Sequence, residues 1–395
     1  MNACYNIVSS IKEYSSMPTV AIASFIPANT NGLLNCYPNG NNRVFINVDN
    51  TGQILFCSCT NSSNVPQPRY STNGGATWTA STMPSNFANI TAVQDVVSNA
   101  SLQTILIFVI GTSPAQSMLP YVSKDYGVTF TQYTTSNIVG GWGGGTSQPA
   151  WAGGVSDDGV YISFVGFSAS SIYGYYRCTN GSTTIASDSF TRLKSTEATM
   201  YGCTVSSTGQ YQVIACGNNT TNANHQISSD YGATWTIMDP YNAITTNYPK
   251  VNSTGTIVWS GNGGYTSTAA QNNCSQYWTG TSSTYSSGWV YNYGQSQWST
   301  QYPNLVLNLD LIDMSSSGKL MMLACSNYTT GQYNNGWLST NYGTSWTRVA
   351  STYYPTYTNV LFGKVGCSKN GKYVAYLTQN ATYNGIFFLT LPTTN

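Results

Sequence analysis

An eight-residue pattern, Ser-x-Asp-x-Gly-x-Thr-Trp, occurs at residues 228–235 and returns with small changes at three other places in the chain. In each copy an Asp or Asn side chain can accept backbone N–H groups inside a tight turn. The glycine supplies a positive φ that other residues resist. The Thr-Trp or Thr-Phe pair is suited to begin a strand whose aromatic ring packs inward. The pattern therefore predicts one kind of β-corner, used repeatedly. The shared positions are Ser71, Asn73, Gly75 and Trp78; Ser123, Asp125, Gly127 and Phe130; Ser228, Asp230, Gly232 and Trp235; and Ser339, Asn341, Gly343 and Trp346.

A second repeated signal is a polar turn that ends in glycine. Such turns occur at Asn50-Thr51-Gly52, Asp158-Gly159, Thr208-Gly209, Thr254-Gly255, Ser317-Gly318 and Asn370-Gly371, with a glycine-free counterpart near Asn99–Ser101. The motif glycine follows the turn glycine by 23 residues in two units and by 25 in a third. Most turns are followed by an apolar run of strand length, such as YQVIACG. Seven units spaced roughly 46–63 residues apart, each with several short strands, predict a β-propeller.

We therefore expect an all-β chain with a single β-propeller of seven blades, each built from four antiparallel strands. Residues 1–18 are expected to form an N-terminal extension, and residues 19–395 the propeller. The last unit, residues 365–392, contains only three strand-like segments. We expect an N-terminal strand, residues 19–26 (TVAIASFI), to complete it, because closing the ring removes exposed strand edges.

The four motif copies resemble the Asp-box (BNR) repeats of sialidase-like propellers. The resemblance covers the first, second, fourth and sixth units directly, and altered copies lie near residues 178–191 and 277–289. In that family the box is the hairpin between the third and fourth strands of a blade, on the face away from the active site. The resemblance therefore implies a structural role for the boxes.

The same resemblance raises the hypothesis of glycoside hydrolysis. In the family three arginines hold the substrate carboxylate, one of them in an Arg-Ile-Pro motif, while a Tyr–Glu pair supplies the nucleophile and an Asp acts as acid and base. This chain has no Arg-Ile-Pro motif, and its arginines are Arg43, Arg69, Arg177, Arg192 and Arg348. Arg192 and Arg348 directly follow a box or its altered copy, which predicts that both lie on outer strands. Sialidase activity is not expected.

A more general glycosidase needs two carboxyl groups across the scissile bond, about 5 Å apart for retention or about 6.5–9.5 Å for inversion. The acids that could reach the face opposite the boxes are Asp95, Glu197, Asp239 and Asp310. Glu197 and Asp239 lie in loops that lead into the next inner strand, so they are the candidate catalytic pair of the alternative hypothesis, a divergent glycoside hydrolase without the arginine triad. They could equally be solvated loop carboxylates.

Four long segments on that face, residues 137–151, 260–278, 326–337 and 351–359, combine aromatic residues with Gly, Asn, Gln and Thr. Flat aromatic faces can stack on sugar rings, and amides and hydroxyls can bond to sugar hydroxyls without any charge. The candidate ligand-binding residues are Trp142, Trp151, Tyr265, Tyr353 and Tyr354. The same segments could instead pack on themselves or contact neighbouring subunits. The leading hypothesis is a non-catalytic binding or assembly module for a glycan or a protein partner.

The low content of charged residues limits the classes of partner that can be expected. Only 6% of the residues are charged, against about 25% in typical soluble proteins, and the net charge is +1. Nucleic-acid binding is not expected, because it requires clustered cations. No apolar run approaches the about 20 residues of a membrane-spanning helix, so membrane insertion is not expected either.

The N-terminus lacks the pattern of a signal peptide, which predicts synthesis in the cytosol. A weakly charged surface rich in hydroxyl and amide groups is typical of a particle exterior or an extracellular surface. Together with reduced cysteines, it resembles the structural proteins of large DNA viruses, so a final place in a virion is a further hypothesis.

The ten cysteines are not expected to form a disulfide framework. Cys59, Cys216 and Cys325 each lie seven residues after a turn glycine, so they occupy equivalent positions in different units and cannot pair with one another. They are expected to be small buried apolar residues. Pairs that involve Cys4, Cys36 or Cys274 stay open. Without a Cys-x-x-Cys pair and with a single histidine, His225, no metal site and no cofactor are expected.

Overall fold

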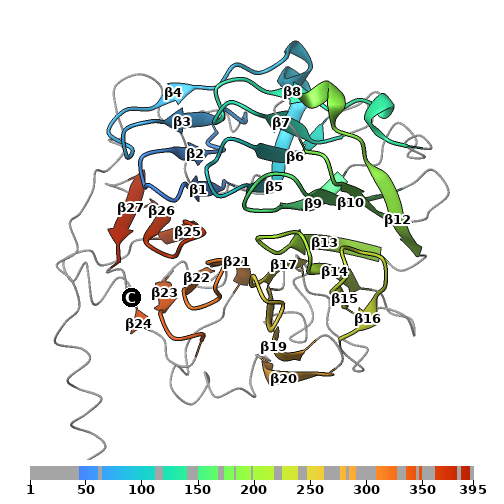
Figure 1. Ribbon diagram of the computed structural model, residues 1–395. Helices are drawn as coiled ribbons and strands as arrows, with labels where there is room; N and C mark the ends of the chain where they lie inside the picture. The colour runs from blue at the N-terminus through green and yellow to red at the C-terminus, as the bar shows by residue number, and fades with distance from the viewer. Residues whose placement is uncertain are drawn as a thin grey trace, which may run out of the picture.

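The computed structural model arranges antiparallel sheets in a ring around a common centre, which is the β-propeller fold (Figure 1). In the part of the chain that the structure describes, six sheets have four strands and a further sheet has three, and in each the strands follow one another in chain order from the centre outward. Helical structure in the described part of the chain is limited to three short 3-10 turns. The structure describes residues 44–60, 65–111, 119–139, 150–167, 173–181, 184–196, 199–217, 225–238, 247–261, 276–281, 284–290, 308–326, 335–343, 347–348, 361–379 and 384–391.

The first three blades contain all three 3-10 turns. Blade 1 comprises β1 (Ile46–Val48), β2 (Leu55–Cys57), β3 (Arg69–Ser71) and β4 (Thr79–Ala80), followed by η1 (Ser85–Asn89). Blade 2 comprises β5 (Ile90–Ser98), β6 (Ile105–Gly111), β7 (Tyr121–Ser123) and β8 (Thr131–Gln132), followed by η2 (Thr135–Asn137). Blade 3 comprises β9 (Ala150–Val155), β10 (Ile162–Phe167), β11 (Tyr173–Cys178), η3 (Ile185–Ser187) and β12 (Thr191–Thr196).

The remaining sheets complete the ring. Blade 4 comprises β13 (Thr199–Val205), β14 (Gln212–Gly217), β15 (Gln226–Ser228) and β16 (Thr236–Ile237). Blade 5 comprises β17 (Asn247–Val251), β18 (Ile257–Gly261), β19 (Gln276–Thr281) and β20 (Thr284–Val290). Blade 6 comprises β21 (Asn308–Met314), β22 (Met321–Ser326), β23 (Asn335–Ser339) and β24 (Thr347–Arg348). The seventh sheet comprises β25 (Leu361–Cys367), β26 (Tyr373–Gln379) and β27 (Asn384–Thr390).

The expectation of seven four-stranded blades requires correction. Among the described residues, four strands are found in each of blades 1 to 6, whereas the seventh sheet has three, β25, β26 and β27. Within the described residues, two strands, β26 and β27, follow the last polar turn. Residues 1–18 and the expected closing strand, residues 19–26, lie outside the described residues.

The four Ser-x-Asp or Ser-x-Asn corners connect the third strand to the fourth in blades 1, 2, 4 and 6. In each corner the serine hydroxyl donates to the Asp or Asn side chain two residues later. The same hydroxyl accepts the N–H of the glycine four residues later, at 2.7–2.9 Å. Trp78 and Trp235 close their corners by donating their indole N–H to the carbonyls of Gly75 and Gly232. Trp346 lies outside the described residues.

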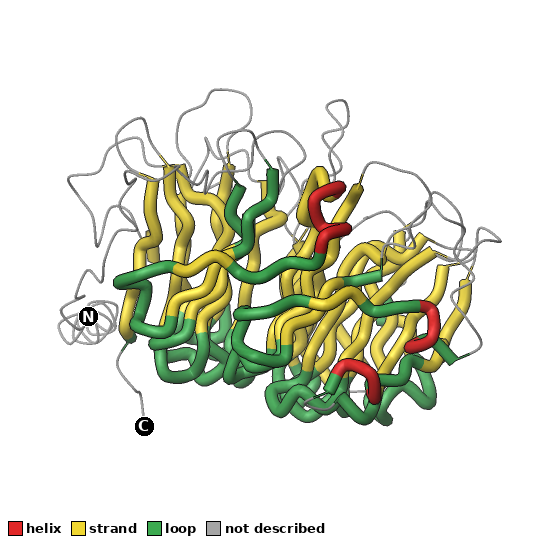
Figure 2. The backbone as a smooth tube through the Cα atoms, turned by 90° about the horizontal axis from the view of Figure 1, so that it is seen from above, coloured by secondary structure: helices red, strands yellow, loops and turns green. Residues whose placement is uncertain are grey.

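The residue before each corner glycine also has a positive φ, which the sequence pattern did not predict. It is Gly74 in blade 1 and a tyrosine in the other three: Tyr126, Tyr231 and Tyr342, with φ of 66°, 58° and 59°. In all four corners the N–H of this residue donates to a backbone carbonyl just after the first turn of the same blade. The corners and the first turns therefore lie on the same face of the ring, where Figure 2 shows the described turns gathered.

The altered corners expected in blades 3 and 5 differ from this pattern. In blade 3 the connection between β11 and β12 contains the 3-10 turn η3. In blade 5, β19 and β20 pair as far as Thr281 and Thr284, so only two residues connect them.

Seven short turns, residues 49–52, 99–102, 156–159, 206–209, 252–255, 315–318 and 368–371, connect the inner strand of each sheet to the next strand. We call them the turn belt. In every turn the side chain of the first residue accepts the N–H of the residue five positions later, at 2.9–3.1 Å. The fourth residue always has a positive φ, and it is glycine except at Leu102, with φ of 58°. All the predicted polar turns therefore form, including the copy without glycine.

Backbone hydrogen bonds join these turns to one another around the ring. The amide of Asn50 donates to the carbonyl of Ala100, that of Ala100 to Asp157, and that of Asp157 to Ser207. The amides of Ser253 and Ser316 likewise donate to Ser316 and Lys369. Asn370 then donates its backbone and side-chain N–H groups to Asn50, both at 2.9 Å. The hydrogen bonds therefore run continuously from the turn of blade 5 through those of blade 6, the seventh sheet and blades 1, 2 and 3 to the turn of blade 4.

Tyrosine rings pack on the glycines of the belt turns and so join neighbouring sheets. The ring of Tyr161 in blade 3 lies on Gly209 of blade 4 so closely that a Cβ at Gly209 would be 2.2 Å from Tyr161 Cγ. Tyr211 packs in the same way on Gly255, and Tyr373 of the seventh sheet on Gly52 of blade 1. The core itself lies between the sheets; the cluster between blade 1 and the seventh sheet, for example, joins Val48 and Leu55 to Phe388. Cys59 and Cys216 are buried, as predicted, and the side chain of Cys325 lies outside the described residues.

Candidate functional site in the central channel

A small cavity lies on the axis of the ring, where the inner strands meet the turn belt. It is lined by residues of β1, β5, β9, β13, β17, β21 and β25 and of the turns that follow these strands. Its volume is about 40 Å³. A space of this size holds about three water molecules and is far below the about 300–1,000 Å³ of typical ligand pockets.

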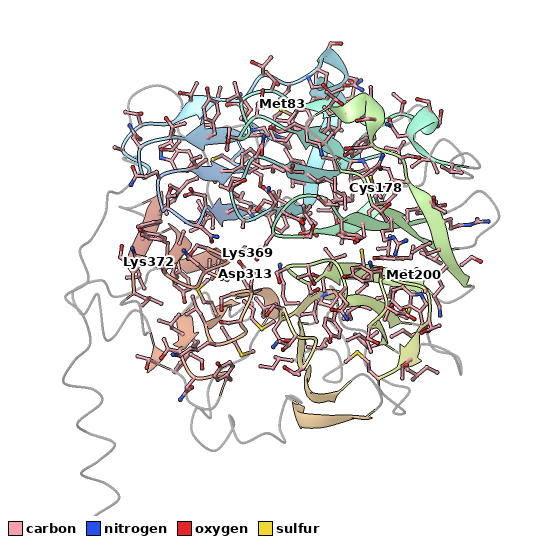
Figure 3. The ribbon with its side chains drawn as sticks, viewed as in Figure 1. Met83, Cys178, Met200, Asp313, Lys369 and Lys372 are labelled. Carbon is pink, nitrogen blue, oxygen red and sulfur yellow. The ribbon has the colours of Figure 1, made fainter. Side chains whose placement is uncertain are left out.

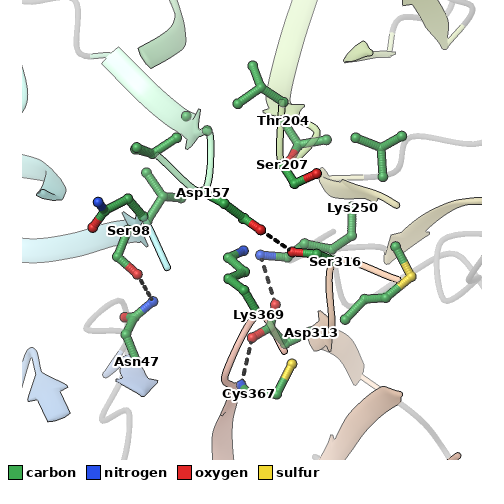
Figure 4. Close-up of a pocket in the computed structure, with 18 of the residues that line it drawn as sticks. Asn47, Ser98, Asp157, Thr204, Ser207, Lys250, Asp313, Ser316, Cys367 and Lys369 are labelled. Carbon is green, nitrogen blue, oxygen red and sulfur yellow. Dashed lines mark hydrogen bonds and ion pairs between the residues drawn. The ribbon is translucent and has the colours of Figure 1, made fainter. Parts of the chain in front are cut away.

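Charged side chains meet in this cavity from four sheets (Figure 4). Lys250 Nζ, from β17, lies 3.3 Å from Asp313 Oδ1, from β21, and the two side chains are 25% and 12% exposed. The second carboxylate oxygen of Asp313 accepts the N–H of Cys367 at 2.9 Å. Lys369 also lines the cavity, and Figure 3 shows it beside Asp313 at the centre of the ring. Asp313 is therefore held by one cation and one amide from its two neighbouring sheets.

A second contact crosses the channel between turns that are far apart in the sequence. Ser316 of blade 6 donates its hydroxyl to Asp157 of blade 3 at 2.7 Å. Asp157 and Ser316 are both second residues of belt turns, as is Lys369. The two lysines, Lys250 and Lys369, and the two aspartates, Asp157 and Asp313, balance one another in formal charge. The cavity therefore contains a polar cluster with no net formal charge, which connects turns on opposite sides of the belt.

Burial and neighbouring charges act in opposite directions on the pKa values of the ion pair. Burial alone would lower the pKa of Lys250, but the negative charges of Asp313 and Asp95 outweigh it and raise that pKa. Burial alone would raise the pKa of Asp313, but Lys250, Lys369 and backbone N–H groups lower it. Both groups thus stay ionised near neutral pH. A carboxyl group with a lowered pKa is unsuited to act as a general acid, which must carry a proton at the working pH.

Most of the sequence-predicted site residues lie outside the described residues. These are Trp142, Tyr265, Tyr353, Tyr354, Glu197 and Asp239. Trp151 belongs to β9 and falls where the pairing of β9 with β10 shifts register, between Ala150 and Ala152. Nothing in the described part of the chain tests the predicted roles of these residues.

The two other acids considered for the face opposite the boxes have different places. Asp95 is 7% exposed in β5, where it accepts the N–H groups of Val96 and Gly153 and so links blades 2 and 3. Asp310 belongs to β21, at a shift of register. Asp95 is therefore a buried acceptor rather than a carboxylate at the mouth of the channel, because its position in the middle of β5 directs it at the neighbouring inner strand.

The arginines lie away from the channel wherever the structure describes them. Arg192 and Arg348 belong to β12 and β24, the fourth strands of their blades, as predicted. Arg69 and Arg177 belong to β3 and β11, which are third strands. Arg43 lies outside the described residues.

Lys250 and Asp313 are the functional candidates that the sequence analysis missed. Each lies two residues before the first residue of a belt turn, Asn252 and Ser315. Asn47 has the same offset from Asp49 and also lines the cavity. A charged residue two positions before a belt turn is a signal that the sequence contains. Its meaning depends on the alignment of all seven turns.

No protein-family model matches the sequence, and no curated protein matches it either. Solved propellers resemble the structure at low sequence identity. A GH74 xyloglucanase from Xanthomonas campestris has a TM-score of 0.57 and 11% identity over 91% of this chain and 53% of that chain. This chain thus spans about half the length of that enzyme. The β-propeller domain of Cps50 (Swd1) from Myceliophteria thermophila has a TM-score of 0.53 and 8% identity over 94% and 100% of the two chains.

An oligogalacturonate lyase from Vibrio parahaemolyticus has a TM-score of 0.56 and 7% identity over 96% and 99% of the two chains. At these identities the similarity shows the propeller fold alone. Within the described residues, no helix has the length and apolar character needed to cross a membrane. In the same part of the chain, no three His, Cys, Asp or Glu side chains are grouped so that they could hold a metal ion.

Proposed function

We propose that this chain is a non-catalytic recognition module in which the turn belt is a rigid base and the opposite face binds an uncharged, hydroxyl-rich glycan. The belt face consists of short turns that are bonded to one another, and its channel is filled by the Lys250–Asp313 pair and the Asp157–Ser316 contact. That face leaves little room for a ligand. Loops that carry recognition residues need a rigid scaffold, and the belt supplies one.

The observation that carries the proposal is a set of β-bulges at the other end of the inner strands. The pairing of β5, β9, β13, β17, β21 and β25 with the next strand shifts register in each case. Most of these shifts lie in the first half of the strand, away from the belt. Bulges redirect side chains and are enriched beside binding and active sites. Trp151 occupies one of them.

Glycan recognition is favoured by the chemistry of the segments that enter and leave these strand ends. They carry Trp142, Trp151, Tyr265, Tyr353 and Tyr354 among amide and hydroxyl residues. Aromatic rings with amides suit the stacked and hydrogen-bonded recognition of a neutral sugar, and the weak net charge of +1 provides no field to attract an ionic ligand. We further propose that the corners are Asp boxes of the sialidase-like type and that residues 19–26 add a fourth strand to β27.

The test is binding to an array of neutral and acidic glycans, followed by titration calorimetry with the best ligand. A Tyr353→Ala, Tyr354→Ala double variant should lose at least tenfold in affinity. Tyr126→Asn is the matched control, because Tyr126 is a 38% exposed tyrosine on the belt face and Asn tolerates its positive φ. Equal losses in both variants would contradict the proposal.

The same protein should leave a panel of chromogenic glycosides and polysaccharides unchanged. Turnover that disappears in Glu197→Gln or Asp239→Asn would replace the proposal by the alternative, a divergent glycoside hydrolase. Binding to a protein subunit of a particle, with no glycan bound, would assign the face to assembly instead.

A further inference from the structure

A buried ion pair joins blades 2 and 3 far from the central channel. Lys124 lies in the corner between β7 and β8, and Asp188 lies between η3 and β12. Lys124 Nζ is 3.1 Å from Asp188 Oδ2, and the two side chains are only 6% and 0% exposed. The pair therefore connects the outer parts of two neighbouring blades in a site that excludes water.

A tyrosine hydroxyl and aromatic rings adjoin the carboxylate of this pair. Tyr133, which is 2% exposed, donates its hydroxyl to the same oxygen, Asp188 Oδ2, at 2.5 Å. Its ring packs edge-on against Phe190, with ring centroids 5.0 Å apart, and Phe164 packs on Phe190 in turn. The carboxylate is thus enclosed by aromatic rings and fixed by the tyrosine.

The Lys124 amine is poorly satisfied for a buried cation. It makes no hydrogen bond of acceptable geometry to any residue that the structure describes, although it lies beside Asp188. An ammonium group has three N–H donors, and burying it with an incomplete set of acceptors is energetically unfavourable. A neutral product of the same two groups would remove this penalty.

We propose that Lys124 and Asp188 condense to an isopeptide bond, an amide between Lys124 Nζ and Asp188 Cγ. In water, hydration of the separate ammonium and carboxylate ions favours the uncondensed pair. The buried site removes that hydration, so the neutral amide becomes the favoured state. The linkage would join blades 2 and 3 covalently at their outer edge.

The reaction needs no oxidant and no cofactor. A proton first moves from Lys124 Nζ to the carboxylate, which yields a neutral amine and a neutral carboxylic acid. The nitrogen lone pair attacks Asp188 Cγ to form the C–N bond. The C–Oδ2 bond then breaks with its electron pair, and the oxygen leaves as water with one proton from the nitrogen and one from the acid. The balance is one amine and one acid giving one amide and one water.

Tyr133 is placed to move these protons. Its hydroxyl donates to Oδ2, the oxygen nearest to the amine and so the one placed to depart. Burial, and then the charge of Asp188, raise the pKa of Tyr133 well above its usual range, so the hydroxyl keeps its proton. It can give a proton to the departing oxygen and take one back from the nitrogen, with no net change in its own state.

The deciding experiment is the intact mass of the purified full chain, measured after denaturation. The expected mass is lower than that of the sequence by one water molecule, and trypsin should release residues 178–192 attached to the peptide that contains Lys124. Lys124→Arg should have the full mass of its own sequence. A wild-type mass equal to that of the sequence, with separate peptides, would overturn the proposal.

Two further variants distinguish loss of the isopeptide bond from loss of the fold, because the mass is measured on the denatured chain. Tyr133→Phe should retain a large uncondensed fraction that decreases over days, and complete condensation in that variant would overturn the role given to Tyr133. Asp188→Ala should show no loss of mass, and a loss of one water there would place the linkage elsewhere and overturn the assignment.

Discussion

His225 provides a pH-dependent test of the packing of blade 4. It is 2% exposed and lies directly before β15, with its backbone carbonyl bonded to the N–H of Met238 at 2.8 Å. Burial lowers the pKa of its imidazole from 6.5 to about 4. The folded protein therefore keeps His225 neutral at pH values where the unfolded chain protonates it.

The sign and size of the effect follow from that difference. The unfolded state binds the proton first, so the stabilising contribution is complete above about pH 6.5 and is lost as the pH falls toward 4. The pKa difference corresponds to a decrease of about 3 kcal/mol in the free energy of unfolding, at about 1.4 kcal/mol per pH unit. Below pH 4 the folded protein also protonates His225, and this contribution no longer changes.

The assay is urea unfolding followed by tryptophan fluorescence at several pH values between 7.5 and 4, for wild type and His225→Gln. The variant is expected to be less stable than wild type near neutral pH and to lose much less stability toward pH 4. The hydrogen-bonded corner carboxylates act in a lower window, because Thr234 and Ser228 lower the pKa of Asp230 to about 2. Parallel pH profiles for the two proteins would refute the account of His225.

Three further predictions concern the belt, the corners and the channel. Gly209→Ala should lower the free energy of unfolding by about 2–4 kcal/mol, because its φ is +76° and its Cβ would meet the ring of Tyr161; an unchanged melting temperature would contradict the packing. Tyr126→Asn should raise the free energy of unfolding by up to about 1 kcal/mol by easing a φ of 66°, and clear destabilisation in urea unfolding would count against that strain. Asp313→Ala should lower the free energy of unfolding by about 1–3 kcal/mol, because it leaves Lys250, a partly buried cation, without its ion-pair partner. The double variant Lys250→Met, Asp313→Leu should recover most of that loss. Additive losses in a double-mutant cycle would contradict a stabilising interaction between Lys250 and Asp313.

The sequence could predict the fold because the corners and turns are local structures with strong chemical requirements. A serine, an Asp or Asn and a glycine at fixed spacing determine each corner, and the same polar-to-glycine signal located the belt, even at Asn99–Ser101 where Leu102 takes the place of glycine. The three strands of the last unit were also predicted. That residues 19–26 complete this sheet stays a prediction, because pairing between distant segments leaves no local signal.

The candidate site could be predicted only in part, because it forms between sheets. Lys250 and Asp313 are 63 residues apart in the sequence and come together where the inner strands of blades 5 and 6 pack side by side. Neither residue belongs to a motif, and charges in strands would ordinarily suggest an exposed face. The same holds for Lys124 and Asp188, which meet across two blades. Loop composition, in contrast, indicates the type of ligand but not the geometry of its binding.

The central claim is that hydrogen bonds join the belt turns of successive sheets, from blade 5 through the seventh sheet and blade 1 to blade 4, and so hold the base of the propeller. Residue-resolved amide hydrogen exchange tests it most directly, with the amides of Ala100, Asp157 and Ser316 as reporters, since each donates to a turn of the next sheet. Slow exchange at these turn positions, comparable to that of the inner strands, is the predicted result. Exchange as fast as in an unstructured peptide at all three amides would contradict it.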